Sequence, residues 1–302
     1  MTILITGSQG LIGTALRDLL ARRGVASRGV DLRAASPDIR RDICDTAHLA
    51  RLLEDIEGIV HLAAVSRVVD GELQPERCNA VNIEATRGLL AAALAAPRRP
   101  WVIYASSREV YGQQDVMPVT EDASFRPMNT YARSKVAAEG LCGAARAAGL
   151  TTAIVRFSSV YGSVADHATR VVPAFIAAGV RGGTLRIEGA ANTFDLTHVD
   201  DVADGLLRLV GLLRSGERTL PPIHFASGTG TSLGELADTA IELGGRRASA
   251  EHAPARTFDI HSFIGDPARA ERLLGWRATT PLAKGLSRLA ADFAASLCDP
   301  AL

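Results

Sequence analysis

The sequence predicts an α/β fold: a doubly wound parallel sheet, followed by a smaller C-terminal α/β part. Short apolar runs alternate with longer helical patterns in the first half of the chain, as in βαβ units. The second half is less regular and carries a Pro-rich connection at 219–222. A chain of 302 residues can form one large domain or two coupled ones. We expect residues 1–164 in the larger domain, with 196–220 returning to it, and 165–195 and 221–302 in the smaller one.

The pattern of apolar residues places the individual elements. Continuous apolar runs predict buried strands at 2–6, 59–64, 101–105 and 152–157. Helical spacing predicts helices at 11–23, 78–96 and 131–148. In the second half we expect strands at 185–188 and 223–226, and helices at 200–214, 232–243 and 281–297.

Composition excludes several classes of function. Lys plus Arg and Asp plus Glu both total 33, which argues against a nucleic-acid or membrane-surface binder. No apolar run is long enough for a membrane span, and the N-terminus lacks a basic leader. The four cysteines are dispersed without a CxxC pair, which favours reduced thiols and a cytoplasmic protein. We predict no metal site.

A glycine-rich segment joins the first strand to the first helix. Gly7, Gly10 and Gly13 have GxxGxxG spacing, and Leu11 and Ile12 begin the helix. Small residues there let the backbone approach a pyrophosphate, which the free N–H groups of the helix N-terminus attract. The segment therefore predicts a dinucleotide site, although a tight turn without a ligand has the same pattern.

Asp31 extends this prediction to the ribose of the dinucleotide. It lies about 20 residues beyond the glycines, where a carboxylate binds the ribose hydroxyls. A carboxylate also repels a 2′-phosphate, which favours NAD over NADP. We interpret the neighbouring Arg28 and Arg33 as surface charge. Asp42 and Ile43 are candidates to flank the adenine.

Tyr131 and Lys135 form a YxxxK pair, which places both side chains on one face of a helix. A tyrosine pKa near 10 must fall to about 7 for work as a base, which requires roughly 4 kcal/mol. Ser107 follows the strand at 101–105, at the sheet edge where ligands bind. The alternatives are a packed tyrosine beside a surface lysine, and a serine that caps a turn.

With these motifs in order along the chain, the sequence resembles the extended short-chain dehydrogenase/reductase family, the NAD-dependent sugar epimerases and dehydratases. The resemblance covers nearly the whole length. It rests on the glycines at 7, 10 and 13, Asp31, residues 61–64, Asn82, residues 106–112, Tyr131 with Lys135, Arg156, and residues 160–162, 198–201 and 274–276.

The resemblance implies a Rossmann domain with tightly held NAD and a C-terminal domain that closes over a nucleotide-activated sugar. Tyr131 would take a proton from a sugar hydroxyl, typically at C4. Lys135 would lower the Tyr131 pKa and hold the nicotinamide ribose, while Ser107 would steady the oxygen. It also implies a homodimer through the helices at 78–96 and 131–148. Further expected cofactor contacts are Leu62, Ala63, Ala64 and Asn82.

Glu109 departs from the epimerase pattern. Dehydratases and some decarboxylases of the family carry an acidic residue there, which can remove the C5 proton of a 4-keto sugar. Dehydratases usually place an Asp just before it, whereas this chain has Arg108, which is no useful proton donor. Glu109 is therefore a tentative catalytic residue. The alternative is a local salt bridge to Arg108 or Arg126.

Two substitutions affect the predicted substrate site. Ser159 stands where many members have Asn, and Phe194 where nucleotide-sugar binders often have Arg. Losing a charged hydrogen bond to phosphate costs roughly 1.5–3 kcal/mol unless another group replaces it. Arg170 and Arg256 are candidates for that replacement, and each is also compatible with plain surface charge. Ser66 completes the expected substrate contacts.

These residues leave four functions open. The first is epimerisation of a nucleotide sugar, probably at C4, through a transient 4-keto intermediate. The second is a nucleotide-sugar 4,6-dehydratase or decarboxylase that uses Glu109. The third is an NAD-dependent dehydrogenase of a free sugar acid, motivated by Phe194 and Ser159. The fourth is a non-catalytic dinucleotide sensor, against which the Ser107, Tyr131 and Lys135 set argues.

Overall fold

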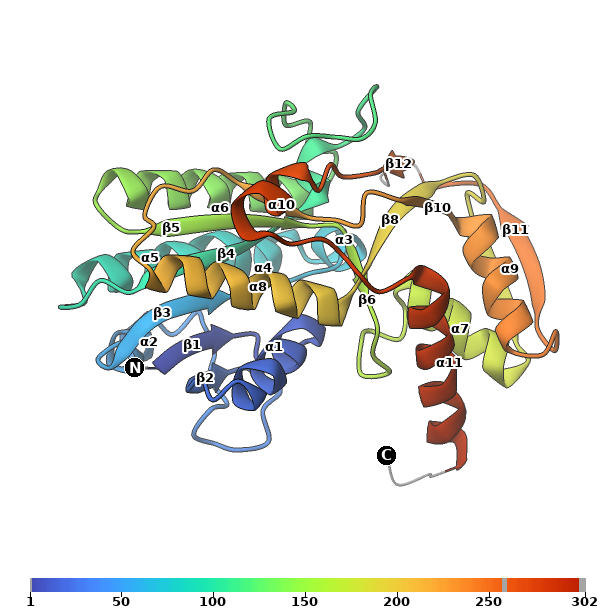
Figure 1. Ribbon diagram of the computed structural model, residues 1–302, viewed down its shortest axis with the longest axis horizontal. Helices are drawn as coiled ribbons and strands as arrows, with labels where there is room; N and C mark the ends of the chain where they lie inside the picture. The colour runs from blue at the N-terminus through green and yellow to red at the C-terminus, as the bar shows by residue number, and fades with distance from the viewer. Residues whose placement is uncertain (1, 257–259, 299–302) are drawn as a thin grey trace.

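A six-stranded parallel sheet forms the larger part of the molecule (Figure 1). The structure is a computed structural model that describes residues 2–256 and 260–298. In spatial order the strands are β2 (Ser27–Val30), β1 (Thr2–Thr6), β3 (Ile56–His61), β4 (Trp101–Ser107), β5 (Thr152–Phe157) and β9 (Ile223–Phe225). This is the predicted doubly wound α/β architecture. The chain reverses direction of travel across the sheet at β1 and β3, which opens a crevice beyond their carboxyl ends.

Helices cover both faces of this sheet, because its strands are apolar on both sides. Ile3 and Ile5 of β1 pack with α1 (Leu11–Arg22), α8 (Val199–Arg214) and α10 (Ala268–Leu274). Leu4 points to the opposite face, where the core includes α2 (Thr46–Leu52), α5 (Ala85–Ala95) and α6 (Thr130–Ala147). Adjacent side chains of a strand point to opposite faces, so one short apolar run contributes to two cores.

The smaller part has its own core beside the carboxyl edge of the sheet (Figure 1). Its core is built from α7 (Val171–Arg181), α9 (Leu233–Leu243) and α11 (Leu282–Cys298). Two small sheets accompany them. One pairs β7 (Thr184–Glu188) with β11 (Ser249–Ala253). The other joins β6 (Ser159–Tyr161), β8 (Thr193–His198), β10 (Gly230–Ser232) and β12 (Ser262–Phe263).

The helix predicted at 78–96 begins earlier and contains an irregular turn. It consists of α4 (Pro75–Asn79), a π-helical turn (Ala80–Glu84) and α5, and α3 (Val68–Leu73) precedes it. Pro75 occupies the first turn of α4, where its missing N–H costs nothing. The π turn contains Asn82, whose side chain bonds the loop after β3. An added residue in a helix often marks a functional site.

Two boundaries differ from those expected from the sequence. The strand predicted at 59–64 is β3, which ends at His61, so residues 62–64 leave the ladder at its carboxyl end. Residues 223–225, expected in the smaller domain, form β9 at the edge of the large sheet. This short apolar run predicts a strand, but it does not indicate which other strand it pairs with. In the described part of the chain, no helix is long and apolar enough to cross a membrane.

Candidate active site

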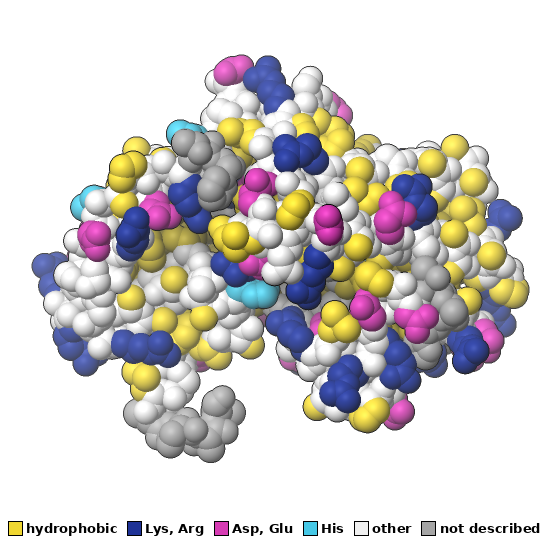
Figure 2. Space-filling view, turned by 180° about the vertical axis from the view of Figure 1, so that it is seen from behind, with side chains coloured by type: hydrophobic (Ala, Val, Ile, Leu, Met, Phe, Trp, Pro, Cys, Tyr) yellow, Lys and Arg dark blue, Asp and Glu magenta, His cyan; other side chains and the backbone are white. Residues whose placement is uncertain are grey.

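A cleft of about 920 Å³ lies between the larger and smaller parts. Its floor comes from the carboxyl ends of β1, β3 and β4, and its far wall from residues of α7, β7 and β8. Arginine side chains are frequent in its lining. Figure 2 shows, from behind, basic side chains together with acidic and His side chains in the furrow between the two parts. Every site residue predicted from the sequence lines this cleft, with the exception of Asn82.

The glycine-rich segment makes one end of the cleft, because its backbone leaves no room for side chains. Gly7 has φ +70°, and a Cβ there would lie 2.7 Å from the backbone N of Ala63. A Cβ on Gly13 would lie 2.2 Å from the backbone O of Gly7. Gly10 caps α1 without any side-chain hydrogen bond, so the first N–H groups of α1 face the cleft.

Asp31 follows β2 and is 8% exposed. Its Oδ2 accepts a hydrogen bond from the backbone N of Gln9 at 2.9 Å, and its Oδ1 accepts one from the backbone N of Arg33 at 2.8 Å. The Arg33 guanidinium lies 3.7 Å from the same carboxylate. Asp31 therefore holds the glycine-rich loop in place while its carboxylate borders the cleft. Asp42 and Ile43 line the cleft near this end.

Asn82 supports the wall of the cleft from behind. Its Oδ1 accepts from the backbone N of Val65 at 2.8 Å, and its Nδ2 donates to the backbone O of Val65 at 3.0 Å and to Ser134 Oγ at 2.9 Å. These bonds tie the 62–66 segment to α6. Leu62, Ala63 and Ala64 then line the cleft itself. The sequence could not distinguish this supporting role from direct contact.

Ser107, Tyr131 and Lys135 meet at the floor of the cleft. Ser107 ends β4, while the other two lie one turn apart on α6. Lys135 donates to the backbone O of Ala105 at 2.8 Å, and its Nζ lies 5.8 Å from the centre of the Tyr131 ring. Asn129 caps the start of α6 by accepting a hydrogen bond from Ala132 N at 2.8 Å, which fixes the helix beside β4.

Burial is the largest cause of the pKa shifts of Tyr131 and Lys135. It raises the pKa of Tyr131 to about 12, although a hydrogen bond from Ser107 opposes the shift. It lowers the pKa of Lys135 to about 8. The residues of the chain alone therefore do not bring Tyr131 to neutral pH. Positive charge brought into the cleft by a bound ligand would lower the pKa of Tyr131.

Glu109 is buried, and its carboxylate contacts two neighbouring side chains. Arg108 Nη2 lies 3.1 Å from Glu109 Oε1, and Asn129 Nδ2 donates to Glu109 Oε2 at 3.2 Å. Arg108 is one of the two salt-bridge partners that the sequence offered for Glu109. The other, Arg126, pairs with Asp115 at 3.2 Å instead. Glu109 lines the cleft, but both of its carboxylate oxygens have donors.

The opposite end of the cleft carries the predicted substrate residues. Arg170 Nη2 donates to Ser66 Oγ at 3.0 Å, and Arg170 Nη1 lies 3.3 Å from Asp166, so the side chain bridges the two parts. Ser159 and Phe194 line the cleft from β6 and β8. Arg256 pairs with Glu188 at 3.3 Å, while residues 257–259 of its sequence motif lie outside the described residues.

Comparison with known proteins decides the family. The model of the NAD dependent epimerase/dehydratase family matches residues 3–220. The chain belongs to this family. A UDP-glucose 4-epimerase of Mycolicibacterium smegmatis is 32% identical, over 95% of this chain and 97% of that protein. A UDP-N-acetyl-alpha-D-glucosaminuronate decarboxylase of Bacillus cytotoxicus is 29% identical over 88% and 87%. The solved structure of MoeE5 with UDP-glucuronic acid and NAD aligns at TM-score 0.89, with 30% identity, over 98% of this chain and 100% of that one.

As in other members of this family, the cofactor is NAD, and the cleft fits it. The backbone cradle at Gly7 and Gly13 would be filled by any Cβ, and the start of α1 offers uncapped N–H groups to a pyrophosphate. A carboxylate stands at the end of β2 for the ribose. Within residues 2–256 and 260–298, no cluster of His, Cys, Asp or Glu is arranged to bind a metal.

Two arginines that line the cleft were not predicted as site residues from the sequence. Arg186, on β7, lines the cleft and pairs with Glu188 at 3.2 Å. The sequence places Arg108 where dehydratases carry an Asp and offers it as a partner for Glu109, but does not predict that it lies over the Phe194 ring, 4.5 Å from its centre. Arg186 lies in an alternating strand, where one face points to the cleft, but the sequence does not show which face. The contact of Arg108 with Phe194 joins residues far apart in the chain.

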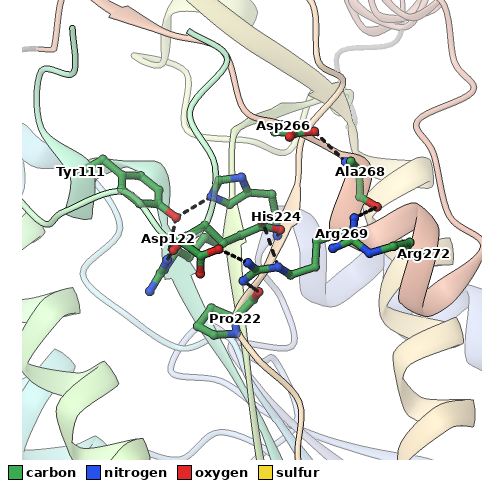
Figure 3. Close-up of polar contacts among 10 residues, drawn as sticks. Tyr111, Asp122, Pro222, His224, Asp266, Ala268, Arg269 and Arg272 are labelled. Atoms are coloured by element: carbon green, nitrogen blue, oxygen red, sulfur yellow. Dashed lines mark hydrogen bonds and ion pairs between the residues drawn. The ribbon is translucent and has the colours of Figure 1, made fainter. Parts of the chain in front are cut away.

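A polar network lies behind the floor of the cleft, around Tyr111 and His224 (Figure 3). Tyr111 Oη and His224 Nε2 are 2.5 Å apart, and Arg156 Nη1 donates to Tyr111 Oη at 2.6 Å. In Figure 3 the network continues to Arg269, which pairs with Asp122 and donates to the backbone O of Pro222 at 3.1 Å. It therefore connects β5 and β9 to the start of α10.

Proposed function

We propose that this chain catalyses the NAD-dependent epimerisation of a nucleotide-activated sugar at C4, through a transient 4-keto intermediate. The observation that supports it best is the convergence of Ser107, Tyr131 and Lys135 at one point of a cleft that begins in a dinucleotide cradle. The names of several relatives agree with this choice, since they are UDP-glucose 4-epimerases.

Each residue of the group has a distinct task in this proposal. Tyr131 Oη takes the proton from the C4 hydroxyl and returns it to the epimer, while Ser107 Oγ donates to the same sugar oxygen. Lys135 holds positive charge beside the tyrosine, and its bond to the Ala105 carbonyl fixes its amine. Bound NAD supplies the reversible oxidation of the C4 alcohol to a ketone. Epimerisation requires the ketone to present its other face before it is reduced again.

The cofactor contacts are part of the same proposal. The start of α1 would hold the pyrophosphate, and Asp31 would accept hydrogen bonds from the adenosine ribose. Asp42 and Ile43 would flank the adenine, and the 62–64 segment would contact the dinucleotide between α1 and Lys135. The residues proposed to contact NAD are Gly7, Gly10, Leu11, Ile12, Gly13, Asp31, Asp42, Ile43, Leu62, Ala63, Ala64, Tyr131 and Lys135. Asn82 acts by holding the 62–66 segment.

Phe194 stands where nucleotide-sugar binders often have an arginine, and two other arginines can take over its role. Arg186 and Arg256 both pair with Glu188 and both line the cleft in the smaller part. They are placed to bind the sugar diphosphate, with Arg170 and Ser66 at the join between the parts. Ser159 lines the same cleft from β6. A phosphate there gains charge-assisted hydrogen bonds of about 1.5–3 kcal/mol each.

A dehydratase or decarboxylase activity remains a second candidate, because Glu109 lines the cleft and one relative is named a decarboxylase. The salt bridge with Arg108 and the bond from Asn129 occupy both oxygens of this carboxylate, which disfavours its contact with a substrate. The dehydrogenase of a free sugar acid is weakened by the arginines available for a diphosphate. The sensor is weakened by the intact tyrosine and lysine.

We also propose a homodimer through α5 and α6. These helices lie side by side, and their outer faces carry small residues. A Cβ added to Gly140 or Gly143 of α6 would meet nothing within 4 Å, so a second helix pair can approach closely. Light scattering should give a mass twice that of one chain, and the Gly140→Glu variant should have the mass of a single chain. A single-chain mass for the unaltered protein would exclude the dimer.

Proton NMR of the purified protein with UDP-glucose, UDP-glucuronic acid and UDP-N-acetylglucosamine, without added NAD, tests the proposed reaction. The expected result is a C4 epimer of at least one sugar at equilibrium. A 4-keto-6-deoxy product or loss of CO₂ would assign Glu109 a catalytic role, which Glu109→Gln should then abolish. Net NADH from a free sugar acid with added NAD would support the dehydrogenase instead.

A further inference from the structure

Arg108 has an unused hydrogen-bonding group at the cleft. Its Nη2 pairs with Glu109, but Nη1 has no hydrogen-bond partner among the described residues and is shielded from solvent. The side chain is 14% exposed and lines the cleft. A buried donor without a partner costs free energy, and in native proteins it calls for an explanation.

Aromatic rings hold this guanidinium in place. The guanidinium carbon lies 4.5 Å from the centre of the Phe194 ring and 5.8 Å from that of Phe263. The rings orient the planar fork, and the pair with Glu109 fixes its other end. Phe194, which the sequence marked as the loss of an arginine, therefore supports another arginine from the opposite part of the molecule.

The position of Arg108 determines which part of a bound nucleotide sugar its side chain can contact. It follows directly after Ser107, the proposed donor to the oxygen on C4. The diphosphate is attached at C1, on the opposite side of a pyranose ring from C4. A group beside Ser107 therefore faces substituents of the carbons next to C4, and C5 is one of these. In a uronic acid, C5 carries a carboxylate.

The geometry points to Arg108 as the residue that selects a sugar with a carboxylate at C5, so that the preferred substrate is a nucleotide-activated uronic acid. This inference rests on the proposed function. An arginine can bridge two carboxylates, with Nη2 on Glu109 and Nη1 on the sugar.

Binding measurements separate this selectivity from catalysis. In Tyr131→Phe protein that retains NAD, calorimetry should show UDP-glucuronic acid binding about 10- to 100-fold more tightly than UDP-glucose, as expected for one charge-assisted hydrogen bond. Equal affinity for the two sugars would overturn the role of Arg108 and leave the proposed reaction standing. Absence of binding by either sugar would overturn both.

Variants at the pair identify the residue responsible. In the same background, Arg108→Gln should reduce the preference for the uronic acid to less than about 3-fold. That change removes one partner of Glu109. The neutral double variant Arg108→Gln/Glu109→Gln is therefore measured as well, and it should lose the preference for the uronic acid to the same extent. Glu109→Gln alone should keep it.

The matched control is Arg246→Gln, at an exposed arginine that pairs with Glu242 away from the cleft. It should leave the ratio of the two affinities unchanged. A preference that survives in the double variant, or one that disappears in Glu109→Gln alone, would overturn the assignment to Arg108. Thermal unfolding of each variant confirms that the comparison is made between folded proteins.

Discussion

Arg156 and Glu139 form a buried ion pair behind the strand end that carries Ser107. Arg156 Nε donates to Glu139 Oε1 at 2.9 Å and Nη2 to Oε2 at 2.6 Å, and the side chains are 4% and 6% exposed. Ser106 Oγ also donates to Glu139 Oε1 at 2.5 Å. One carboxylate therefore joins α6, β4 and β5, which carry or border the proposed catalytic group.

Removing this carboxylate should destabilise the fold. Glu139→Ala leaves the Arg156 guanidinium buried without its charged partner, which costs about 3–5 kcal/mol in the free energy of unfolding. Urea denaturation measures this loss directly. Glu242→Ala, which breaks an exposed pair with Arg246, should cost less than about 1 kcal/mol. Similar losses for the two variants would contradict a structural role for the buried pair.

Loss of the Tyr131 hydroxyl should stop proton transfer without emptying the site. Tyr131→Phe should lower kcat about 10²–10⁴-fold while the purified protein keeps its NAD. The matched control is Tyr104→Phe, because Tyr104 Oη is buried without a partner in the described chain and Lys135 Nζ lies 5.0 Å from that ring. Its kcat should change by less than about threefold. Equal effects at the two tyrosines would remove Tyr131 from the proposed mechanism.

The larger part was predictable because its signals are local. The strands at 2–6 and 152–157 were located to the residue, since apolar runs between glycines or polar turns mark their ends. The YxxxK pair needs only helical periodicity to bring Tyr131 and Lys135 together. The glycine spacing likewise identifies its turn, because Gly7 and Gly13 are required by backbone contacts within a few residues or across neighbouring strands.

The smaller part was harder because its contacts join distant segments. β6, β8, β10 and β12 are short, and their pairing is set by packing that no single run of residues reveals. The partners of Arg108 show the same limit: Glu109 is its neighbour in sequence, whereas Phe194 comes from another part of the chain. A supporting role such as that of Asn82 also depends on the loop it binds.

Asp31 should set the choice between NAD and NADP. Asp31→Ser removes the carboxylate that borders the ribose site, so NAD binding should weaken about 10- to 100-fold. NADP binding should improve, because the negative charge that repels a 2′-phosphate is gone and Arg33 is nearby. The double variant Asp31→Ser/Arg33→Ser should lose that improvement. Cofactor titration by fluorescence measures both affinities, and unchanged selectivity would place the ribose elsewhere.

Two buried histidines should make stability depend on pH. Burial, followed by the charge of Lys135, lowers the pKa of His61 to about 3, and burial, followed by Arg156, does the same for His224. Both are neutral in the fold, whereas in the unfolded chain they titrate near 6.5. The unfolded state therefore binds more protons as pH falls below 6.5, and stability present above that pH is lost progressively down to about 3.

Between pH 7.5 and 5.5 the free energy of unfolding should fall by about 1.4 kcal/mol for each of the two histidines. Urea denaturation at the two pH values measures the difference. His61 is held by Thr6 Oγ1 at 2.7 Å and Thr86 Oγ1 at 3.0 Å, contacts that the amide of His61→Gln can partly replace. That variant should show a smaller pH dependence than the wild type, because one titrating group is gone. A wild-type protein equally stable at both pH values would mean that these side chains are protonated in the fold.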